Sequence, residues 1–188
     1  MFVGSFAHPP NADAVRWFLS DVFPLVRAEV PDARLQIVGR GVPDDLLAQA
    51  GEGVDILGWL PSLDVIYARS RVAIAPLRYG AGLKGKVAEA LSHGVPVVVT
   101  RIAAEGMGIE HGESGWVADD PVGFAQGVIG LIRDDEMWTR LATSGQELIE
   151  QSLGVGRFEQ LLAEAPERVL QQRGVPVGAD NGPAVGGA

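Results

Sequence analysis

Short apolar runs alternate along this chain with longer segments in which apolar residues recur every three or four positions. The apolar runs are rich in valine and isoleucine, and such runs are typical of buried strands. We expect strands at residues 1–4, 34–38, 54–57, 71–76, 95–100 and 116–118. The segments with the longer period predict helices at residues 12–29, 44–50, 62–70, 83–93, 122–133, 135–150 and 158–172.

The order of these elements predicts the fold class. Strands that alternate with helices and are apolar throughout form a mainly parallel sheet covered on both faces, so we expect an α/β, Rossmann-like fold. A chain of 188 residues with 47% apolar content forms one good core, which predicts a single domain over residues 1–173. Residues 174–188, rich in glycine, proline and alanine, are expected to be a disordered tail.

Polar residues and prolines mark the starts of two helices. Asn11 or Asp13 is expected to cap the first helix, and Asp119 or Asp120 is expected to cap a later one that begins at Pro121. The chain opens inside a strand, with no turn or helix cap before it. We therefore expect it to be one domain of a longer protein.

The charge and the residue types exclude several classes of function. A net charge of −9 argues against nucleic acid or an anionic membrane surface as the main partner. The absence of cysteine excludes disulfides, thiolate metal sites and cysteine nucleophiles, and the three histidines lack the spacing of a metal site. No apolar run is long enough to cross a bilayer. We expect a cytoplasmic protein without a bound metal or cofactor.

The only two lysines lie together, although the chain has 15 cationic residues. Lys84 and Lys86 stand where a glycine-rich loop enters the helix predicted at residues 83–93. The free N–H groups and the dipole already make a helix N-terminus positive, so two more cations there favour a bound anion. Gly80 and Gly82 let the backbone approach a phosphate or diphosphate closely.

One face of the same helix carries further candidate chemistry. Lys86, Glu89 and His93 follow one another at helical spacing, and a carboxylate one turn from a phosphate site can accept from ribose hydroxyls. The opposite face, made of Val87, Ala90, Leu91 and Gly94, is expected to pack on the sheet. The alternative is a solvated Lys86–Glu89 ion pair, but the dipole favours the reverse order of those two charges.

Two loops add weaker candidates. His8 follows the first strand on the side where open α/β sheets bind ligands, although an ordinary loop histidine is the simpler interpretation. The Gly39-Arg-Gly41 sequence invites a dinucleotide interpretation, but Asp44 replaces the third glycine and a turn explains the pair equally well. Arg40 remains a candidate for a ligand cleft. Arg78 and Arg101 are expected to form one local cationic cluster with the two lysines.

The stretch Gly-x-Gly-Leu-Lys-Gly-Lys-Val-x-Glu-Ala-Leu-x-x-Gly-Val-Pro-Val-Val at residues 80–98 resembles the donor-site motif of the retaining group 1 glycosyltransferases of GT-B fold. The similarity extends from residue 2 to about residue 158. It implies that the chain is the C-terminal, nucleotide-sugar-binding half of a two-domain enzyme that transfers a sugar with retention, in glycan or polysaccharide biosynthesis. The donor is expected to be a UDP-, GDP- or ADP-sugar.

The resemblance also implies roles for individual residues. Gly82, Lys84 and Lys86 bind the donor diphosphate, Glu89 binds ribose, and Trp59 and Leu60 line the base pocket. From the sequence alone a packing role explains Trp59 equally well. A missing N-terminal domain is implied to bind the acceptor, which is a glycan, lipid or small molecule, and could hold the enzyme peripherally at a membrane.

The motif departs from the family at two places. Many members carry a second glutamate eight residues before the ribose-binding one, and here that position is Ala81. Many also carry an arginine and a lysine after the first strand, where this chain has a loop that includes Ser5 and His8. Sugar contacts are then expected from the backbone around Tyr79, and the catalytic residues are not assigned. A non-catalytic nucleotide-sugar-binding module and a sugar-nucleotide epimerase of the same architecture remain alternatives.

Overall fold

A computed structural model of the protein describes residues 1–51, 53–80 and 84–153. The strands in these ranges are β1 (Phe2–Val3), β2 (Leu35–Val38), β3 (Val54–Gly58), β4 (Ala73–Ala75), β5 (Val97–Val99) and β6 (Trp116–Val117). The helices are α1 (Pro9–Trp17), the π-helix η1 (Phe18–Val22), α2 (Phe23–Glu29), α3 (Asp44–Leu47), α4 (Asp64–Arg69), α5 (Gly85–Ser92), α6 (Arg101–Ala104), α7 (Pro121–Arg133) and α8 (Asp135–Leu153). The predicted helix at residues 158–172 and the predicted tail lie outside the described residues.

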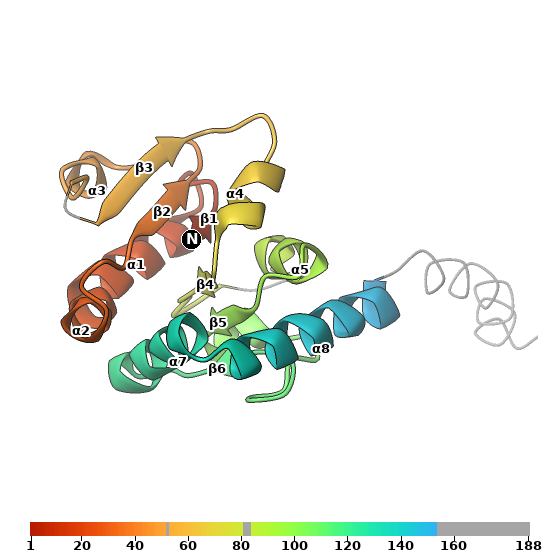
Figure 1. Ribbon diagram of the computed structural model, residues 1–188. Coiled ribbons are helices and arrows are strands. Elements are labelled where there is room, and N and C mark those ends of the chain that lie inside the picture. The colour runs from red at the N-terminus through yellow and green to blue at the C-terminus, as the bar shows by residue number, and fades with distance from the viewer. Residues whose placement is uncertain (52, 81–83, 154–188) are drawn as a thin grey trace, which may run out of the picture. The chain divides into compact units, whose positions relative to one another are not determined.

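The strands form two parallel sheets that meet at β1 and β4 (Figure 1). One sheet has the order β1-β2-β3, with Phe2 opposite Ile37, and the other has the order β4-β5-β6, with Ala73 opposite Val97. The Ile74 N–H donates to the Met1 carbonyl at 2.9 Å and joins the two sheets. The combined order β3-β2-β1-β4-β5-β6 is that of a doubly wound fold, so the predicted Rossmann-like α/β class is confirmed.

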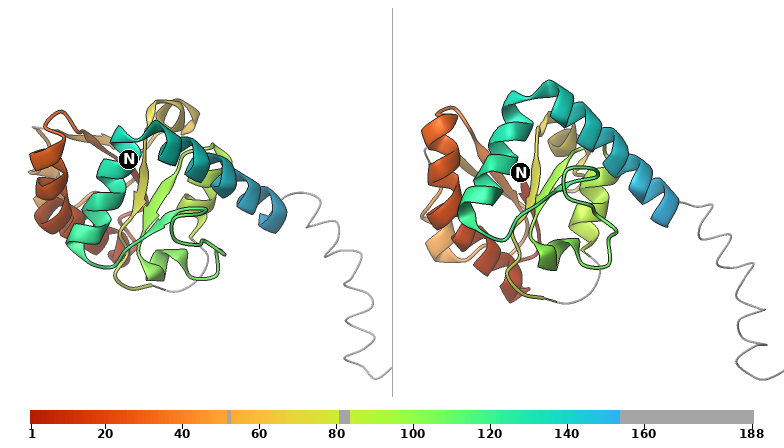
Figure 2. Two further views of the ribbon diagram at one scale, coloured as in Figure 1. Left: turned by 60° about the horizontal axis from the view of Figure 1, so that its bottom comes forward. Right: turned by 90° about the horizontal axis from the view of Figure 1, so that it is seen from below.

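Helices cover both faces of these strands (Figure 2). On one face α1, η1 and α2 pack with α7, where the Trp17 and Phe124 rings meet edge to face at 5.6 Å. On the other face Tyr67 of α4 stacks on His93 at the end of α5, with 4.5 Å between the ring centroids. The Val97–Val99 strand between these layers is at most 2% exposed. Such a strand is apolar along its whole length because neither face reaches water.

The first helix differs from its prediction. It begins at Pro9, with His8 at the N-cap and no side-chain cap, so the expected cap by Asn11 or Asp13 is wrong. Proline suits the first helical position because its φ is fixed and no N–H is needed there. The single helix expected over residues 12–29 is divided by η1, which lies just before Pro24. Pro24 has no N–H to donate to the preceding turn, which favours the irregular segment.

Two helix starts after β5 show the value of side-chain caps. The predicted cap of α7 is confirmed, because Asp120 accepts from the Gly123 N–H at 2.9 Å and Pro121 is the first helical residue. The short helix α6 was not predicted, because the glycines that follow it favour a loop. Its N-cap is Thr100, whose hydroxyl accepts from the Ala103 N–H at 3.2 Å. No helix among the described residues is long and apolar enough to span a membrane.

Candidate donor site

The carboxyl ends of β1, β2 and β4 meet the N-terminus of α5 at the point where the strand order reverses. In doubly wound sheets this is the position where ligands bind. The loop after β1 is held to the next strand by the Gly4 N–H, which donates to Val38 at 2.9 Å, and by the Phe6 N–H, which donates to Arg40 at 2.9 Å. The backbone around the candidate site is therefore anchored.

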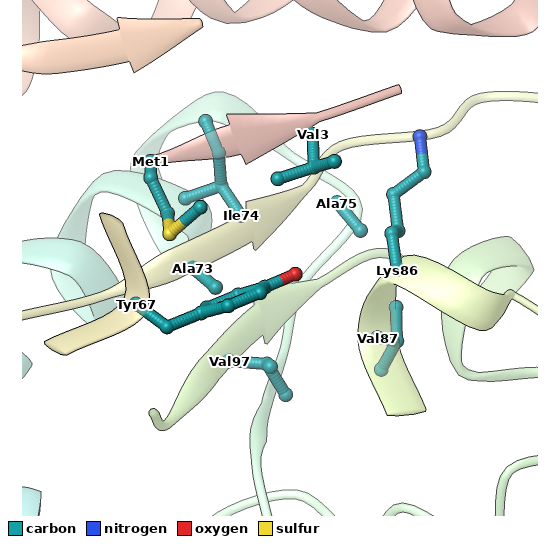
Figure 3. Close-up of a pocket in the computed structure, with 9 residues that line it drawn as sticks. All are labelled: Met1, Val3, Tyr67, Ala73, Ile74, Ala75, Lys86, Val87 and Val97. Carbon is teal, nitrogen blue, oxygen red and sulfur yellow. The ribbon is translucent and has the colours of Figure 1, made fainter. Parts of the chain in front are cut away.

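Lys86 extends from the first turn of α5 past Val3 to the end of β1 (Figure 3). Its ammonium group donates to the Asn11 side-chain oxygen and lies 4.3 Å from the centre of the Phe2 ring. Burial, and secondarily the charge of Lys84, lowers the pKa of Lys86 to about 8. Among the described residues Lys86 forms no ion pair, so the predicted alternative of a Lys86–Glu89 pair is not present.

Asn11 and Gly4 place this lysine. Asn11 is 5% exposed, and its amide nitrogen donates to the Ser5 carbonyl at 2.7 Å, which leaves its oxygen directed at Lys86. A Cβ atom on Gly4 would lie 2.7 Å from the Asn11 amide nitrogen and 2.9 Å from the Lys86 Nζ. Glycine is therefore required where the lysine and the asparagine approach the end of β1.

Lys84 takes a different direction from Lys86. It is the N-cap residue of α5, is 7% exposed and donates to the Gly80 carbonyl at 3.4 Å. The two lysines therefore lie on either side of the helix entry, one toward the glycine loop and one toward β1. Ala81 and Gly82, which were predicted to contact the donor, lie outside the described residues.

Two arginines of the predicted cationic cluster are engaged elsewhere. Arg78 donates to the Asp13 carboxylate of α1 at 2.9 Å, and Arg101 forms an exposed ion pair with Asp119 at 3.3 Å. Their charges are thus partly compensated, whereas the Lys86 ammonium lies against a neutral amide and a ring and forms no ion pair among the described residues. Tyr79, next to Arg78, is 47% exposed.

The face of α5 that carries Lys86 continues to Glu89 and His93. Glu89 is half-buried, and His93 Nδ1 lies 2.8 Å from the Glu89 carbonyl oxygen. His93 Nε2 lies 3.1 Å from the Asp64 carboxylate, and these two acceptors raise the pKa of His93. On the opposite face Val87, Ala90 and Leu91 pack inward as predicted and are at most 1% exposed, whereas Gly94 is half-buried.

A cleft of about 280 Å³ lies beside Gly4, and four predicted site residues line it: Ser5, Arg40, Trp59 and Leu60. The Arg40 guanidinium lies 4.3 Å from the centre of the Trp59 ring. Trp59 is 57% exposed, so core packing does not explain it. Gly4 lines the cleft and is also close to the Lys86 ammonium, so the cleft and the ammonium lie on either side of one residue.

Other predicted residues lie apart from this surface. His8 is exposed at the start of α1 and does not line the cleft. Gly39 is explained by sterics, because a Cβ atom there would lie 1.8 Å from the Gly4 carbonyl oxygen. Within the described ranges no group of three or more histidine, aspartate or glutamate side chains is arranged to hold a metal ion.

Asn11 is the site residue that sequence reasoning missed, because its residue type and place suggest a helix cap instead. It lies on the same helical stripe as Val15, Phe18 and Val22, all of which are buried. A polar residue on an apolar stripe needs a buried partner. The place of Asn11 on this apolar stripe could therefore have indicated, from the sequence, that its side chain has a buried partner.

Comparisons with known proteins agree with this architecture. The family described as "Glycosyl transferases group 1" matches residues 1–134. An uncharacterized 44.6 kDa protein in the cps region of Klebsiella pneumoniae is 31% identical over 162 residues, covering 81% of this chain and 42% of that protein. A phosphatidyl-myo-inositol mannosyltransferase of Mycolicibacterium smegmatis is 30% identical over 144 residues, covering 73% of this chain and 36% of that protein.

A solved structure shows the same fold. A mutant of S. aureus TarM, in complex with fondaparinux, α-GlcNAc-glycerol and UDP, superposes with a TM-score of 0.74 at 16% identity, covering 88% of this chain and 34% of that one. The chain spans less than half the length of the curated relatives that it matches. The family match covers most of the chain and confirms the resemblance drawn from residues 80–98: this protein belongs to the group 1 glycosyltransferases.

Proposed function

We propose that this chain is the nucleotide-sugar-binding domain of a retaining glycosyltransferase, the C-terminal half of a GT-B enzyme. The observation that carries the proposal is Lys86, a partly buried ammonium at the N-terminus of α5 that has no carboxylate partner among the described residues. Together with Lys84 and the free N–H groups of α5 it provides a positive field that suits a diphosphate.

In this proposal the donor extends from this helix end to the cleft. The diphosphate lies at Lys84 and Lys86, with Gly82 in the adjoining loop, and Glu89 accepts from the ribose hydroxyls. The base lies against Trp59 and Leu60 in the cleft of about 280 Å³. The exposure of Trp59 supports this placement, since a ring at a protein surface is available for stacking.

The lysines contribute to the chemistry as well as to binding. When the bond from the sugar to the diphosphate breaks, negative charge grows on the departing oxygen. Positive groups fixed near that oxygen stabilise the transition state more than the ground state, which accelerates transfer. No metal is needed in this scheme, because two ammonium groups and a helix N-terminus neutralise the leaving group.

The donor is a UDP-, GDP- or ADP-sugar. TarM was solved with UDP, and the M. smegmatis relative is named a mannosyltransferase, so both a UDP-linked and a mannose donor have support among relatives. The acceptor, a glycan, lipid or small molecule, is held by a further domain of the enzyme. That domain also supplies much of the catalytic geometry, and the isolated chain binds donor without transferring sugar.

Calorimetry tests the proposal. UDP, GDP and ADP are titrated into the protein in the presence of EDTA, and we expect one of them to bind with a dissociation constant between millimolar and micromolar. Lys86→Ala should weaken the diphosphate far more than the parent nucleoside, whereas Glu89→Ala should weaken both. Strict dependence on magnesium, or equal losses for both ligands on Lys86→Ala, contradicts the assignment.

A further inference from the structure

Tyr67 is the starting point for a further inference, because its hydroxyl is the one buried side-chain polar atom in the described residues that has no hydrogen-bond partner. The side chain is 2% exposed and lies between α4 and the strands. An unsatisfied buried hydroxyl destabilises a fold, and phenylalanine fills the same space without that cost. Packing alone therefore does not explain why this residue is a tyrosine rather than a phenylalanine.

The position of the phenol along α5 points to that role. Its ring stacks on His93, with 4.5 Å between centroids and 23° between planes, and its hydroxyl enters a small cavity lined by Lys86 and Val87 (Figure 3). Lys86 and His93 are two helical turns apart on one face, and Glu89 lies between them. The phenol and the Glu89 carboxylate are near enough to interact electrostatically.

The negative charge of Glu89 affects the ionisation of the Tyr67 hydroxyl. Burial, and after it the charge of the Glu89 carboxylate and its hydrogen-bonding approach to the phenol, raise the pKa of Tyr67, so the hydroxyl keeps its proton and is available as a donor. A phenol O–H that faces a carboxylate forms a strong, charge-assisted hydrogen bond once the geometry allows it. Glu89 is half-buried, and the Tyr67 hydroxyl does not form a hydrogen bond of full geometry with it in this structure.

We propose that Tyr67 is a positioning residue that donates its hydroxyl hydrogen bond to one oxygen of Glu89 when a nucleotide is bound, and so directs the other oxygen at the ribose hydroxyls. The proposal rests on the proposed function, because it assumes that Glu89 binds ribose. It adds a residue from α4 to a site otherwise built from α5 and the loops after β1 and β3. The proposal also gives a function to a buried hydroxyl that has no hydrogen-bond partner of full geometry in this structure.

The test is the variant Tyr67→Phe, which removes the hydroxyl and keeps the ring on His93. The ligands are whichever of UDP, GDP and ADP binds the wild-type protein best, and its 2′,3′-dideoxy counterpart. We expect the variant to weaken the ribonucleotide about tenfold and to change the dideoxynucleotide by less than about twofold. Its melting temperature should be equal to or above that of the wild-type protein, because the buried hydroxyl forms no hydrogen bond of full geometry in the free state.

Two comparisons sharpen the test. Ser70→Ala removes a hydroxyl at the other end of α4, where it bonds its own helix at Ile66, and should leave both affinities unchanged. In the Glu89→Gln background, Tyr67→Phe should cause less than about a twofold further loss if the two residues act together. Equal losses for both nucleotides, or fully additive losses, overturn this inference alone. If the wild-type protein binds none of the three diphosphates, that result contradicts the proposed function, and the inference that rests on it is then also wrong.

Discussion

The Lys86 ammonium lies 4.3 Å from the centre of the Phe2 ring, so the first strand contributes the face of an aromatic ring to the candidate site. The ring and the neutral Asn11 amide stabilise the cation only in part, because the pKa of Lys86 is lowered to about 8. If the proposed site is correct, a bound diphosphate supplies the missing negative charge and raises this pKa again. Binding and protonation at Lys86 would then be linked.

The first prediction is that nucleoside diphosphate binding weakens as the pH rises through about 8. The free protein loses the Lys86 proton near that pH and the complex keeps it, so affinity should fall by roughly tenfold between about pH 7 and 9. Calorimetry across this range, with Lys86→Gln as the control, checks the effect. The control should bind weakly with a flatter profile, and identical pH profiles for the two proteins would exclude Lys86 as the linked group.

The second prediction is that Lys86→Met stabilises the fold at neutral pH while it weakens diphosphate binding. The unfolded chain holds the lysine proton up to its ordinary pKa of about 10.5, and the folded chain releases it near 8. The buried ammonium therefore costs stability below pH 8, of the order of 1 kcal/mol or more, and this cost disappears as the pH rises toward 10.5. Urea unfolding at about pH 7 and about pH 9.5 should show the advantage of the variant shrinking. An advantage that stays constant would point to packing instead.

A third prediction concerns Gly39 and Gly41, the two glycines that invite a dinucleotide interpretation in the sequence. A Cβ atom on Gly39 would lie 1.8 Å from the Gly4 carbonyl oxygen, so Gly39→Ala should lower the free energy of unfolding by about 3 kcal/mol or prevent folding. Gly41 has φ +72° but its nearest neighbour is 3.9 Å from the added atom, so Gly41→Ala should cost only about 1 kcal/mol. Equal costs for the two variants, measured by urea unfolding, would contradict the steric account.

Local patterns predicted the elements around the site correctly. The runs that became β4 and β5 are apolar along their length, and both strands are at most 7% exposed. The inward face of α5 followed from helical spacing because burial along one helix depends mainly on its own period. The Asp120 cap was also visible, since a capping side chain and its N–H partner are three residues apart.

Long-range partners could not be predicted in the same way. Asn11 and Lys86 are 75 residues apart, and Arg78 and Asp13 are 65 apart. Their contacts depend on how β1, β4 and α1 come together, which no local period encodes. The sequence therefore predicted a cationic helix entry, but it could not show that Arg78 is paired with a carboxylate while Lys86 is paired with an amide.

The last prediction is that this chain binds a donor nucleotide but transfers no sugar to an acceptor. The chain spans less than half the length of the curated relatives that it matches, and we propose that a further domain of the enzyme binds the acceptor. Lys84, Lys86 and Glu89 are proposed to bind the donor, and no residue is proposed to orient an acceptor hydroxyl. Transfer requires the reacting atoms to be held roughly 3–3.5 Å apart, and loss of that geometry removes most of the rate enhancement. Water needs no such site, so slow hydrolysis of the nucleotide-sugar can persist.

Acceptor glycosylation and donor hydrolysis should be measured together for this chain and for a longer form that carries the acceptor domain. Efficient glycosylation by this chain alone would mean that the catalytic geometry lies within residues 1–188, and the division of labour proposed here would be wrong.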